Sequence, residues 1–396
     1  RLTEPNSMSE ETTTDPKIMA LPHPVRLEAA VGAPIDTLLF ERAGVMDGLR
    51  PYLTDDTAPT EVVINVVPGV QGVAINYFGV DPGGNMGSFV LFLIRARLRA
   101  YGDPILQVTP ALQEMLSETD IGTELPTRFF RPPYPLVYIE FARPNNLRVT
   151  NKHSGLHECE GAYLSSHDVP PHSELFSNRA RNEALQLDPA KPTRVVEIVI
   201  TGSPVGKNDA LDDASQDVML FLQDEDECLQ TVLERHIQFF QSPQSYSQPG
   251  LAPLSNEEVK RASPIIYELA KVLLYLNLPE ARQFKLSERS DLEQRLSKLG
   301  PKKAAKLKRK QGYVYDRVVV GPENISDMTD FGGGDQEGDQ DPAKRSVRPH
   351  WRRGHFRRIR YGEGRREVRI GWIPPTLVNA EAFQGSTQKK KPYVVK

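Results

Sequence analysis

The segment 349–358, PHWRRGHFRR, gathers the residue types of a phosphate-handling site close to the C-terminus. His350 and His355 are five positions apart. Two histidines beside arginines supply the general base, general acid and phosphate stabiliser that metal-free RNA cleavage needs. Arginine also holds phosphate through two parallel hydrogen bonds and stacks on bases, so the same residues suit RNA binding without catalysis. A third interpretation is internal, with the arginines paired to acidic groups elsewhere in the chain.

The choice of arginine over lysine favours binding. Between residues 344 and 371 the chain has ten arginines and one lysine. A tail that only needed positive charge would use lysine as freely, so the preference indicates planar, oriented contacts with RNA, a ribonucleoprotein or an acidic peptide. Trp351, Phe356 and Tyr361 would extend such a surface by stacking on bases. The residues expected to bind nucleic acid or a partner are His350, Arg352, Arg353, His355, Arg357, Arg358, Arg360, Tyr361 and Arg369.

The charge distribution points to the same end of the chain. The formal net charge is −3, yet residues 341–396 carry fifteen basic and four acidic residues, a balance of +11 that leaves −14 for residues 1–340. A basic tail on an acidic body indicates a polyanionic partner, usually nucleic acid. A preference for duplex DNA over RNA would instead indicate a phage or plasmid DNA-binding regulator.

Two other chemical signals are weak, and we expect no metal and no cofactor. The loop 201–208, TGSPVGKN, is one residue short of a phosphate-binding loop and has Asn208 where a magnesium-binding hydroxyl is needed. The stretch 153–172 contains a single cysteine, whereas a structural zinc site normally shows paired cysteines or a cysteine pair and a histidine pair. Its possible ligands are His153, His157, Cys159, His167 and His172.

The arginines must be positioned by a β-hairpin. Residues 355–373, HFRRIRYGEGRREVRIGWI, predict two strands with GEG at the turn. On the second strand one face takes Arg366, Val368, Ile370 and Trp372, and the other takes Arg365, Glu367 and Arg369. Because a two-stranded unit is marginal alone, it must pack on the segment 376–383, on the body or on a partner.

The rest of the chain predicts an α+β fold. We expect a hairpin at 61–80, a helix over 89–102, a helix capped by Thr109 that ends near Glu118, and a strand at 135–141. We further expect a strand at 194–200, helices through 217–223 and 228–240, a Ser255 capping box, a helix from Pro264, and a helix capped by Ser290 with Glu293. The segment 302–310, KKAAKLKRK, suits an exposed helix or linker as well as a nucleic-acid contact.

The expected domains follow composition. They are a disordered tail (1–18), an N-terminal α+β domain (19–150), a mixed domain (151–320), an acidic glycine-rich linker (321–343) and the arginine-rich module (344–396). With 39% hydrophobic residues, two cysteines and no apolar run near the length of a membrane span, the chain is expected in the cytoplasm. It begins with arginine, so Met8 or Met19 are plausible true starts.

The C-terminal sequence resembles a known family. RPHWRRGHFRRIRYGEGRREVRIGWIPPTLVN, from residue 348 to 379, is similar to the signature of the VA-two family of type V-A anti-CRISPR proteins. Residues 92–141 and 265–282 are similar to further regions of that family, whereas the segment 61–80 and the acidic linker have no counterpart. The motif positions are His350, Arg352, Arg353, Gly354, His355, Trp372, Pro374, Val378 and Asn379.

The resemblance implies a phage or plasmid protein that acts in the bacterial cytoplasm against a type V CRISPR effector nuclease. It implies recognition of the effector's nascent peptide during translation and loss of its message. The contact of the arginine-rich module with RNA or the ribosome is instead expected from the residues of the module. Gly354 would sit where a side chain interferes, and Trp372 and Pro374 would be packing residues. A non-enzymatic adaptor is the preferred interpretation, and a ribonuclease that uses His350 and His355 is the alternative.

Overall fold

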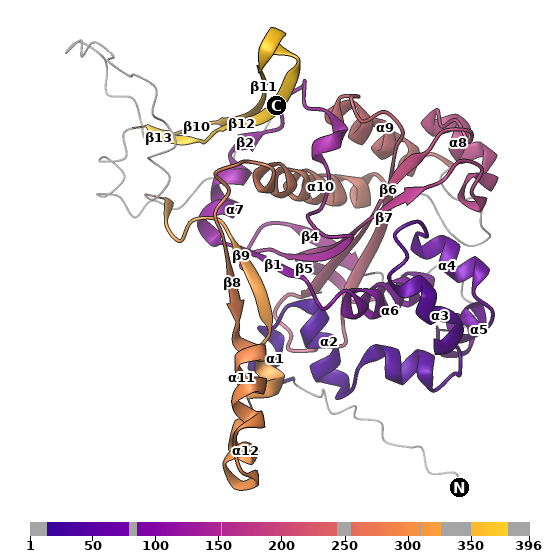
Figure 1. Ribbon diagram of the computed structural model, residues 1–396, viewed down its shortest axis with the longest axis vertical. Coiled ribbons are helices and arrows are strands. Elements are labelled where there is room, and N and C mark those ends of the chain that lie inside the picture. The colour runs from indigo at the N-terminus through magenta and orange to yellow at the C-terminus, as the bar shows by residue number, and fades with distance from the viewer. Residues whose placement is uncertain are drawn as a thin grey trace, which may run out of the picture.

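A mixed β-sheet between two layers of helices forms the body of the protein (Figure 1). The computed structural model describes residues 14–78, 85–151, 153–243, 255–308, 310–325 and 350–378. Helices and strands mix along these ranges, which confirms the α+β class expected from the sequence. No helix in the described ranges combines the length and apolar character needed to span a bilayer.

The sheet joins segments from distant parts of the chain. Its strands are β1 (Ile105–Val108), β3 (Leu136–Glu140), β4 (Arg148–Asn151), β5 (Gly155–Val169), β6 (Thr193–Pro204), β7 (Ala214–Leu222), β8 (Gln283–Ser287) and β9 (Asp316–Val320). They lie in the order β7-β6-β5-β3-β1-β9-β8, with β4 beside β5. β1 runs parallel to β3 and β9, and the other neighbours are antiparallel.

The N-terminal helices cover one face of the sheet. They are α1 (Pro16–Met19), α2 (His23–Val31), the π-helix η1 (Asp36–Glu41), α3 (Met46–Leu53), α4 (Thr60–Val66), α5 (Val70–Phe78) and α6 (Asn85–Ala100). Leu136 and Tyr138 of β3 share a core with these helices, and the alternate residues Val137 and Ile139 belong to the core on the opposite face. The period of two along β3 therefore separates the two cores.

The opposite face is covered mainly by α7 (Pro110–Ser117) and α10 (Asn256–Leu276) together with α9 (Leu229–Gln241). The short helices η2 (Thr127–Phe129), η3 (Glu174–Ser177) and α8 (Arg179–Leu185) complete this part of the chain. Beyond the sheet edge at β8 lie α11 (Glu288–Ser297), α12 (Pro301–Lys308) and η5 (Gln311–Tyr313), which project from the body in Figure 1.

The C-terminal residues form two small sheets. One contains β2 (Thr119–Asp120), β11 (Gly354–Tyr361) and β12 (Glu367–Ile373), with η7 (Glu363–Arg365) at the turn; the other pairs β10 (His350–Arg352) with β13 (Thr376–Val378). The predicted hairpin over 355–373 is confirmed. The predicted alternation on β12 is also confirmed, because Ile370 and Trp372 are buried whereas Glu367 and Arg369 are exposed.

Several sequence-based predictions of the body are confirmed. Thr109 accepts a hydrogen bond from the Leu112 amide and caps α7 ahead of Pro110. Ser255 and Glu258 form a reciprocal capping box at the start of α10. The strands predicted at 135–141 and 194–200 are β3 and β6, and the helices predicted at 89–102 and 228–240 are α6 and α9.

The prediction of a hairpin at 61–80 is wrong. The segment forms α4 and α5, separated by a turn in which Gly69 has a φ of +83°. Val63, Val67, Val70 and Val73 recur at helical spacing and are buried in the core against α6. The β-branched residues suggested strands, but packing of this apolar stripe outweighs their small intrinsic preference.

Three further predictions need correction. The helix predicted through 217–223 is part of β7, whose residues pair with β6 along the strand. Pro264 lies inside α10 instead of starting it. Ser290 caps no helix, since α11 begins at Glu288 and the Ser290 hydroxyl donates to Asp316. Long antiparallel pairing and tertiary hydrogen bonds decide these segments, and neither is visible in local sequence.

The predicted boundary between residues 150 and 151 falls inside β4, and the sheet takes strands from both sides of it. How the chain divides into domains stays a prediction. α1 begins within the tail predicted to lack structure, and Ile325 of the predicted linker packs on the core. The rest of that linker, from residue 326, lies outside the described residues.

Candidate functional site

The two faces of the β11–β12 hairpin have opposite environments. Phe356 pairs with Trp372 across the strands, and Arg358 pairs with Ile370. Phe356, Ile370 and Trp372 are at most 7% exposed and belong to the core beneath α10. The apolar side chains of the hairpin are therefore buried in the core of the body. This burial stabilises the hairpin, which would be only marginally stable as an isolated two-stranded unit.

Trp372 fixes the hairpin to the body. Its ring meets the ring of Tyr275 on α10 edge-on, with the centroids 5.6 Å apart, and stacks on Phe356 at 5.8 Å. Its indole N–H donates to the hydroxyl of Thr119 on β2 over 3.3 Å. The packing role expected for Trp372 matches this position, because a buried tryptophan usually places both its apolar ring and its N–H.

Gly354 lies where the backbones crowd together. β11 runs parallel to β2, with Gly354 opposite Thr119, and the Gly354 amide donates to the Glu118 carbonyl over 2.9 Å. A Cβ at this position would lie 2.7 Å from the Ile373 carbonyl and from Pro375. The requirement for glycine is thus one of space, as expected from the sequence.

The second face of the hairpin presents its charges to solvent. Arg357 and Arg369 are exposed on it, and the guanidinium of Arg369 lies 5.7 Å from the ring centre of Tyr361. Arg360 is also exposed, but it lies next to the turn on the face of Phe356. A hydrogen bond with Glu367 raises the pKa of Tyr361. The remaining arginines of the predicted set are Arg352 and Arg353, both exposed, and Arg358, which is half-buried.

Within the described part of the chain, Asp120 is the carboxylate that pairs with these arginines. Arg353 donates to Asp120 over 2.8 Å, and both side chains are more than half exposed. Among the residues that the structure describes, the other predicted arginines make no ion pair. An internal role, in which the arginines serve to bind the acidic body, therefore applies to Arg353 alone within this part of the chain.

The aromatic residues predicted to stack on bases have different environments in the structure. Phe356 is 1% exposed and stacks on Trp372, so the prediction that it offers a free stacking surface is wrong. Tyr361 is 44% exposed, and the guanidinium of Arg369 lies over its ring. The side chain of Trp351 lies outside those the structure describes. The strand alternation explains the outcome for Phe356, because it shares a face with the buried partner strand residues.

The two candidate catalytic histidines lie on different strands. His355 is exposed on β11, and His350 begins β10, where its backbone pairs with Val378. The ring of His350 is outside the described side chains, and Asn379 is outside the described residues. Pro374 follows β12 and is half-buried. Catalysis by His350 and His355 therefore stays a prediction.

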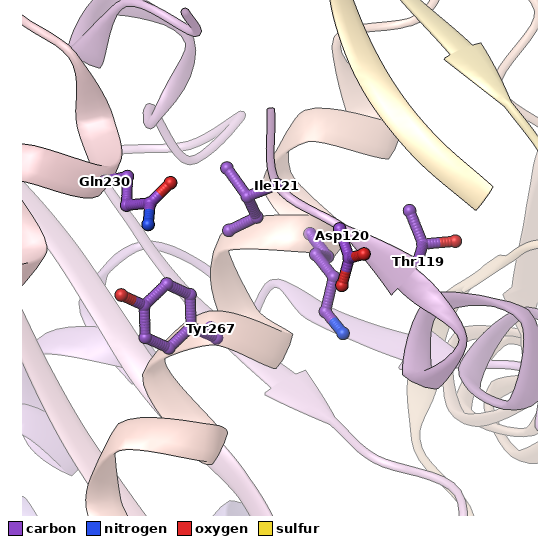
Figure 2. A pocket seen from close by; sticks show the side chains of 6 residues that line it. Thr119, Asp120, Ile121, Gln230 and Tyr267 are labelled. Atoms are coloured by element: carbon purple, nitrogen blue, oxygen red, sulfur yellow. The ribbon is translucent and has the colours of Figure 1, made fainter. Parts of the chain in front are cut away.

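A pocket of about 290 Å³ opens beside the base of the hairpin (Figure 2). Thr119, Asp120 and Ile121 form one wall, and Gln230, Tyr267 and Lys271 from α9 and α10 form the other. The Lys271 ammonium donates to the Leu116 carbonyl and to Glu268, so it is already neutralised. Asp120 links this pocket to the hairpin, because it also accepts the bond from Arg353.

The histidines between 153 and 172 are dispersed. His157 is buried and contacts the Ser154 hydroxyl through Nε2 and the Gly202 carbonyl through Nδ1, while His167 contacts Ser165. Within the described ranges, no three His, Cys, Asp or Glu side chains are grouped so as to hold a metal ion. The loop after residue 204 leads into the strand β7, whereas a phosphate-binding loop leads into a helix.

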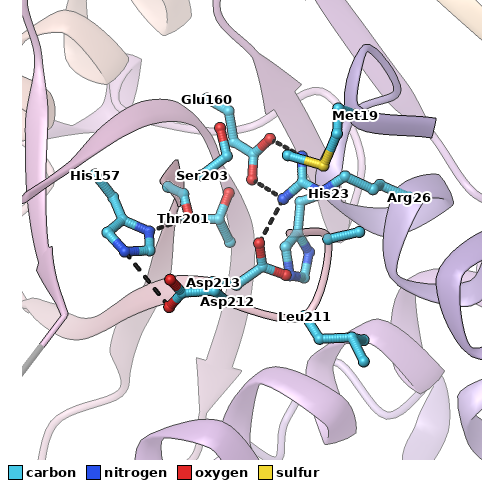
Figure 3. A network of polar contacts seen from close by, with 12 residues as sticks. Met19, His23, Arg26, His157, Glu160, Thr201, Ser203, Leu211, Asp212 and Asp213 are labelled. Atoms are coloured by element: carbon cyan, nitrogen blue, oxygen red, sulfur yellow. Dashed lines mark hydrogen bonds and ion pairs between the residues drawn. The ribbon is translucent and has the colours of Figure 1, made fainter. Parts of the chain in front are cut away.

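Ser154, His157 and Asp212 are close together but are not arranged as a catalytic triad. Asp212 lies 3.7 Å from His157 Nε2, on the same ring nitrogen that contacts Ser154 (Figure 3). A triad needs the carboxylate at the opposite nitrogen, which here faces the Gly202 carbonyl. The trio is a polar contact of the sheet edge.

A buried ionic network was not predicted from the sequence. Arg26 on α2 is fully buried and donates to Glu160 on β5 and to Asp213 ahead of β7 (Figure 3). Burial lowers the pKa of Arg26, but the charges of Glu160 and Asp213 raise it on balance. His23 contacts the hydroxyl of Tyr163 over 2.8 Å beside it. Arg26 shows no local signal, because its partners lie more than 130 positions away in the chain.

Comparisons with known proteins agree with the C-terminal signature. The model of the anti-CRISPR type V subtype A2 family matches residues 106–380. A crystal structure of AcrVA2 is similar at 16% identity and a TM-score of 0.47, covering 91% of this chain and 100% of that one. No curated protein matches. Since the family match spans most of the chain, including the sheet, α10 and the hairpin, this protein belongs to the anti-CRISPR type V subtype A2 family.

Proposed function

We propose that this anti-CRISPR protein lowers production of a type V effector nuclease in the cytoplasm of a bacterial host of phages or plasmids. In this proposal the body recognises the nascent effector peptide during translation. The exposed face of the β11–β12 hairpin contacts RNA, either the transcript or the ribosome. The effector message is then lost, and the protein works as an adaptor without catalysing the cleavage itself.

The observation that carries the RNA contact is the asymmetry of the hairpin. One face is held in the core by Phe356 and Trp372, and the other offers Arg357 and Arg369 to solvent. Arg360 lies on the same face as Phe356 but is exposed next to the turn. A fixed scaffold reduces the entropy lost when the guanidinium groups become ordered on a partner. Phosphate oxygens match the planar donors of arginine, and Tyr361 lies where a base could stack.

The pocket at Asp120 supports the peptide contact. The volume of this pocket, about 290 Å³, is just below the range of volumes typical of sites for whole cofactors and drug-sized ligands. Such a space suits an anchoring side chain of a peptide. Because Asp120 also binds Arg353, a peptide in the pocket and RNA on the hairpin would lie next to each other. This proximity fits a protein that acts while the peptide is still attached to the ribosome.

Co-expression with a type V effector tests the proposal. The effector message and the effector protein are measured with the wild type and with the variant Arg357→Gln, Arg360→Gln, Arg369→Gln. We expect the wild type to lower both, and we expect the variant to restore both. A second effector gene, whose first codons encode an unrelated peptide, should be insensitive to the wild type.

The matched control replaces the exposed arginines Arg42, Arg50 and Arg179 with glutamine, which removes the same charge away from the hairpin. This control should act like the wild type. Undiminished message and protein with the wild type would contradict the proposal as a whole. Equal activity of the hairpin variant and the wild type would contradict the RNA contact of the hairpin.

A further inference from the structure

A second basic surface lies at the other end of the molecule. Helices α11 and α12 and the turn η5, residues 288–313, extend from the strands β8 and β9 and are here named the basic arm. In Figure 1 the basic arm forms the lower end of the long axis, and the β11–β12 hairpin forms the upper end. The two surfaces are therefore separate, and the hairpin does not account for the arm.

The end of the arm is densely charged. Residues 298–310 contain seven basic residues and no acidic one. Five of the lysines have described side chains, all of them exposed: Lys298, Lys302, Lys303, Lys308 and Lys310. None of these five makes an ion pair with a carboxylate in the ranges that the structure describes. Their charges are available to an external partner.

The stability of the fold does not explain these lysines. Lys302 and Lys303 occupy the first turn of α12, which has no acidic residue. A helix N-terminus carries partial positive charge, so cations there are unfavourable by a few tenths of a kcal/mol each. The neighbouring lysines also repel one another. Exposed residues without a positive charge would make α12 more stable than these lysines do.

The packing of α12 sets the direction of the charges. Ala304 and Leu307 are half-buried, and the main contacts of α12 are with α11 and η5. An eight-residue helix is not stable by itself in water, so this contact holds it in place. With its apolar side occupied, the helix has no free apolar face with which to enter a lipid surface.

We propose that the basic arm binds the phosphate backbone of RNA as a second contact site. Lysine ammonium groups act as point charges and contact phosphates without a defined geometry, whereas the arginines of the hairpin suit oriented contacts. The arm would thus add affinity without base preference. An RNA long enough to reach both ends would gain from the high effective concentration of the second site once the first is bound.

The salt dependence of RNA binding by the full chain is the measurement. The probe is a labelled single-stranded RNA of mixed sequence, and the arm variant is Lys302→Gln, Lys303→Gln, Lys308→Gln. Each phosphate contact on a single strand contributes about 0.7 to the slope of log K against log salt, so we expect the slope to fall by about 2. The arm lysines contribute no counterion release at 1 M salt, where the two lines should therefore meet. The affinity at 0.1 M salt, one decade lower, should then fall by roughly 100-fold.

Two control variants make the result specific. Replacing the exposed Lys191, Lys207 and Lys260 with glutamine removes the same charge elsewhere and should leave the slope near that of the wild type. Replacing the three arm lysines with arginine keeps the charge and should keep the slope. Circular dichroism and the thermal midpoint establish that each variant is folded.

The outcomes also separate the arm from the hairpin. If the arm variant keeps the wild-type slope while the variant of Arg357, Arg360 and Arg369 loses it, the arm proposal is overturned and the hairpin proposal stands. The reverse result supports the arm and removes the RNA contact of the hairpin. Arm-dependent binding to polyglutamate or to phosphatidylserine vesicles, with RNA binding unaffected, overturns the proposal in favour of another partner.

Discussion

Arginine has opposite roles in the N-terminal layer and in the C-terminal hairpin. Arg26, Arg95 and Arg97 are almost fully buried, and each donates to acceptors that the fold supplies, although the Nε–H of Arg26 has no partner among the described residues. Arg95 donates to Glu28 and Asp103, while Arg97 donates to the backbone carbonyls of its surroundings. In the hairpin the same residue type is exposed, or half-buried at Arg358, and, Arg353 excepted, has no carboxylate partner among the described residues.

The difference shows how one residue type serves two purposes. A buried guanidinium must have its hydrogen bonds satisfied, since an unpaired buried charge is strongly destabilising. Such an arginine is structural, and its partners are fixed. An exposed guanidinium on a rigid strand contributes little to stability and keeps its donors for a partner. The number of acceptors supplied by the fold distinguishes the two cases.

The largest effect is expected at Arg26. The substitution Arg26→Met leaves Glu160 and Asp213 buried without their shared cation, so the free energy of unfolding should fall by about 3–5 kcal/mol. Urea denaturation measures this change. The control Arg50→Met breaks a pair with Asp47 that is largely exposed and should change stability by less than about 0.5 kcal/mol. Similar losses for the two variants would remove the distinction between buried and exposed arginines.

A slightly smaller effect is expected at Trp372, where the hairpin meets the body. Trp372→Ala removes the contacts with Tyr275 and Phe356 and should reduce the stability of the docked hairpin by about 3 kcal/mol. Amide hydrogen exchange of residues 354–373 should become faster, while exchange in the sheet strands stays slow. The neighbouring Ile373→Ala, on the exposed face, is the control and should leave exchange nearly unchanged.

Glu140 gives a third test, because this buried carboxyl has neutral hydrogen-bond donors. Tyr315 donates to it over 2.8 Å and Gln107 over 3.2 Å, and burial raises its pKa to about 7. Between pH 5 and 7 the folded state therefore binds more protons than the unfolded state, so stability falls as the pH rises. The loss should be about 2 kcal/mol across this window.

The variant Glu140→Gln isolates that contribution. An amide stays neutral and still accepts hydrogen bonds, so the variant should lack this part of the pH dependence and be more stable than the wild type at pH 8. Denaturation curves at pH 5, 6, 7 and 8 provide the comparison, with the exposed Glu363→Gln as the control. Parallel curves for the wild type and Glu140→Gln would show that the carboxyl titrates normally.

The sequence predicted what depends on local pattern. The alternation on β12 placed Trp372 and Ile370 on one shared face, and the capping residues Thr109 and Ser255 marked helix starts. Predictions for the body were wrong or missing where residues distant in the sequence determine the structure. β7 is a strand because it pairs with β6, and Arg26 is buried because Glu160 and Asp213 surround it. The prediction for Phe356 was wrong because alternation gives the shared face but not which face is buried, and the core that buries this face belongs to the body.

The smallest effect on stability is expected from the residues on which the proposed function depends most. The variant Arg357→Gln, Arg360→Gln, Arg369→Gln should change the free energy of unfolding by less than about 0.5 kcal/mol, because these side chains are solvated and have no ion pair in the described part of the chain. Phe356→Ala, on the inner face of the same strand, should lower it by about 3 kcal/mol. Denaturation of both variants alongside the wild type measures the contrast. A loss of more than about 1 kcal/mol in the arginine variant would mean that these charges hold the hairpin to the body, and the hairpin arginines would then belong with Arg26 as structural residues.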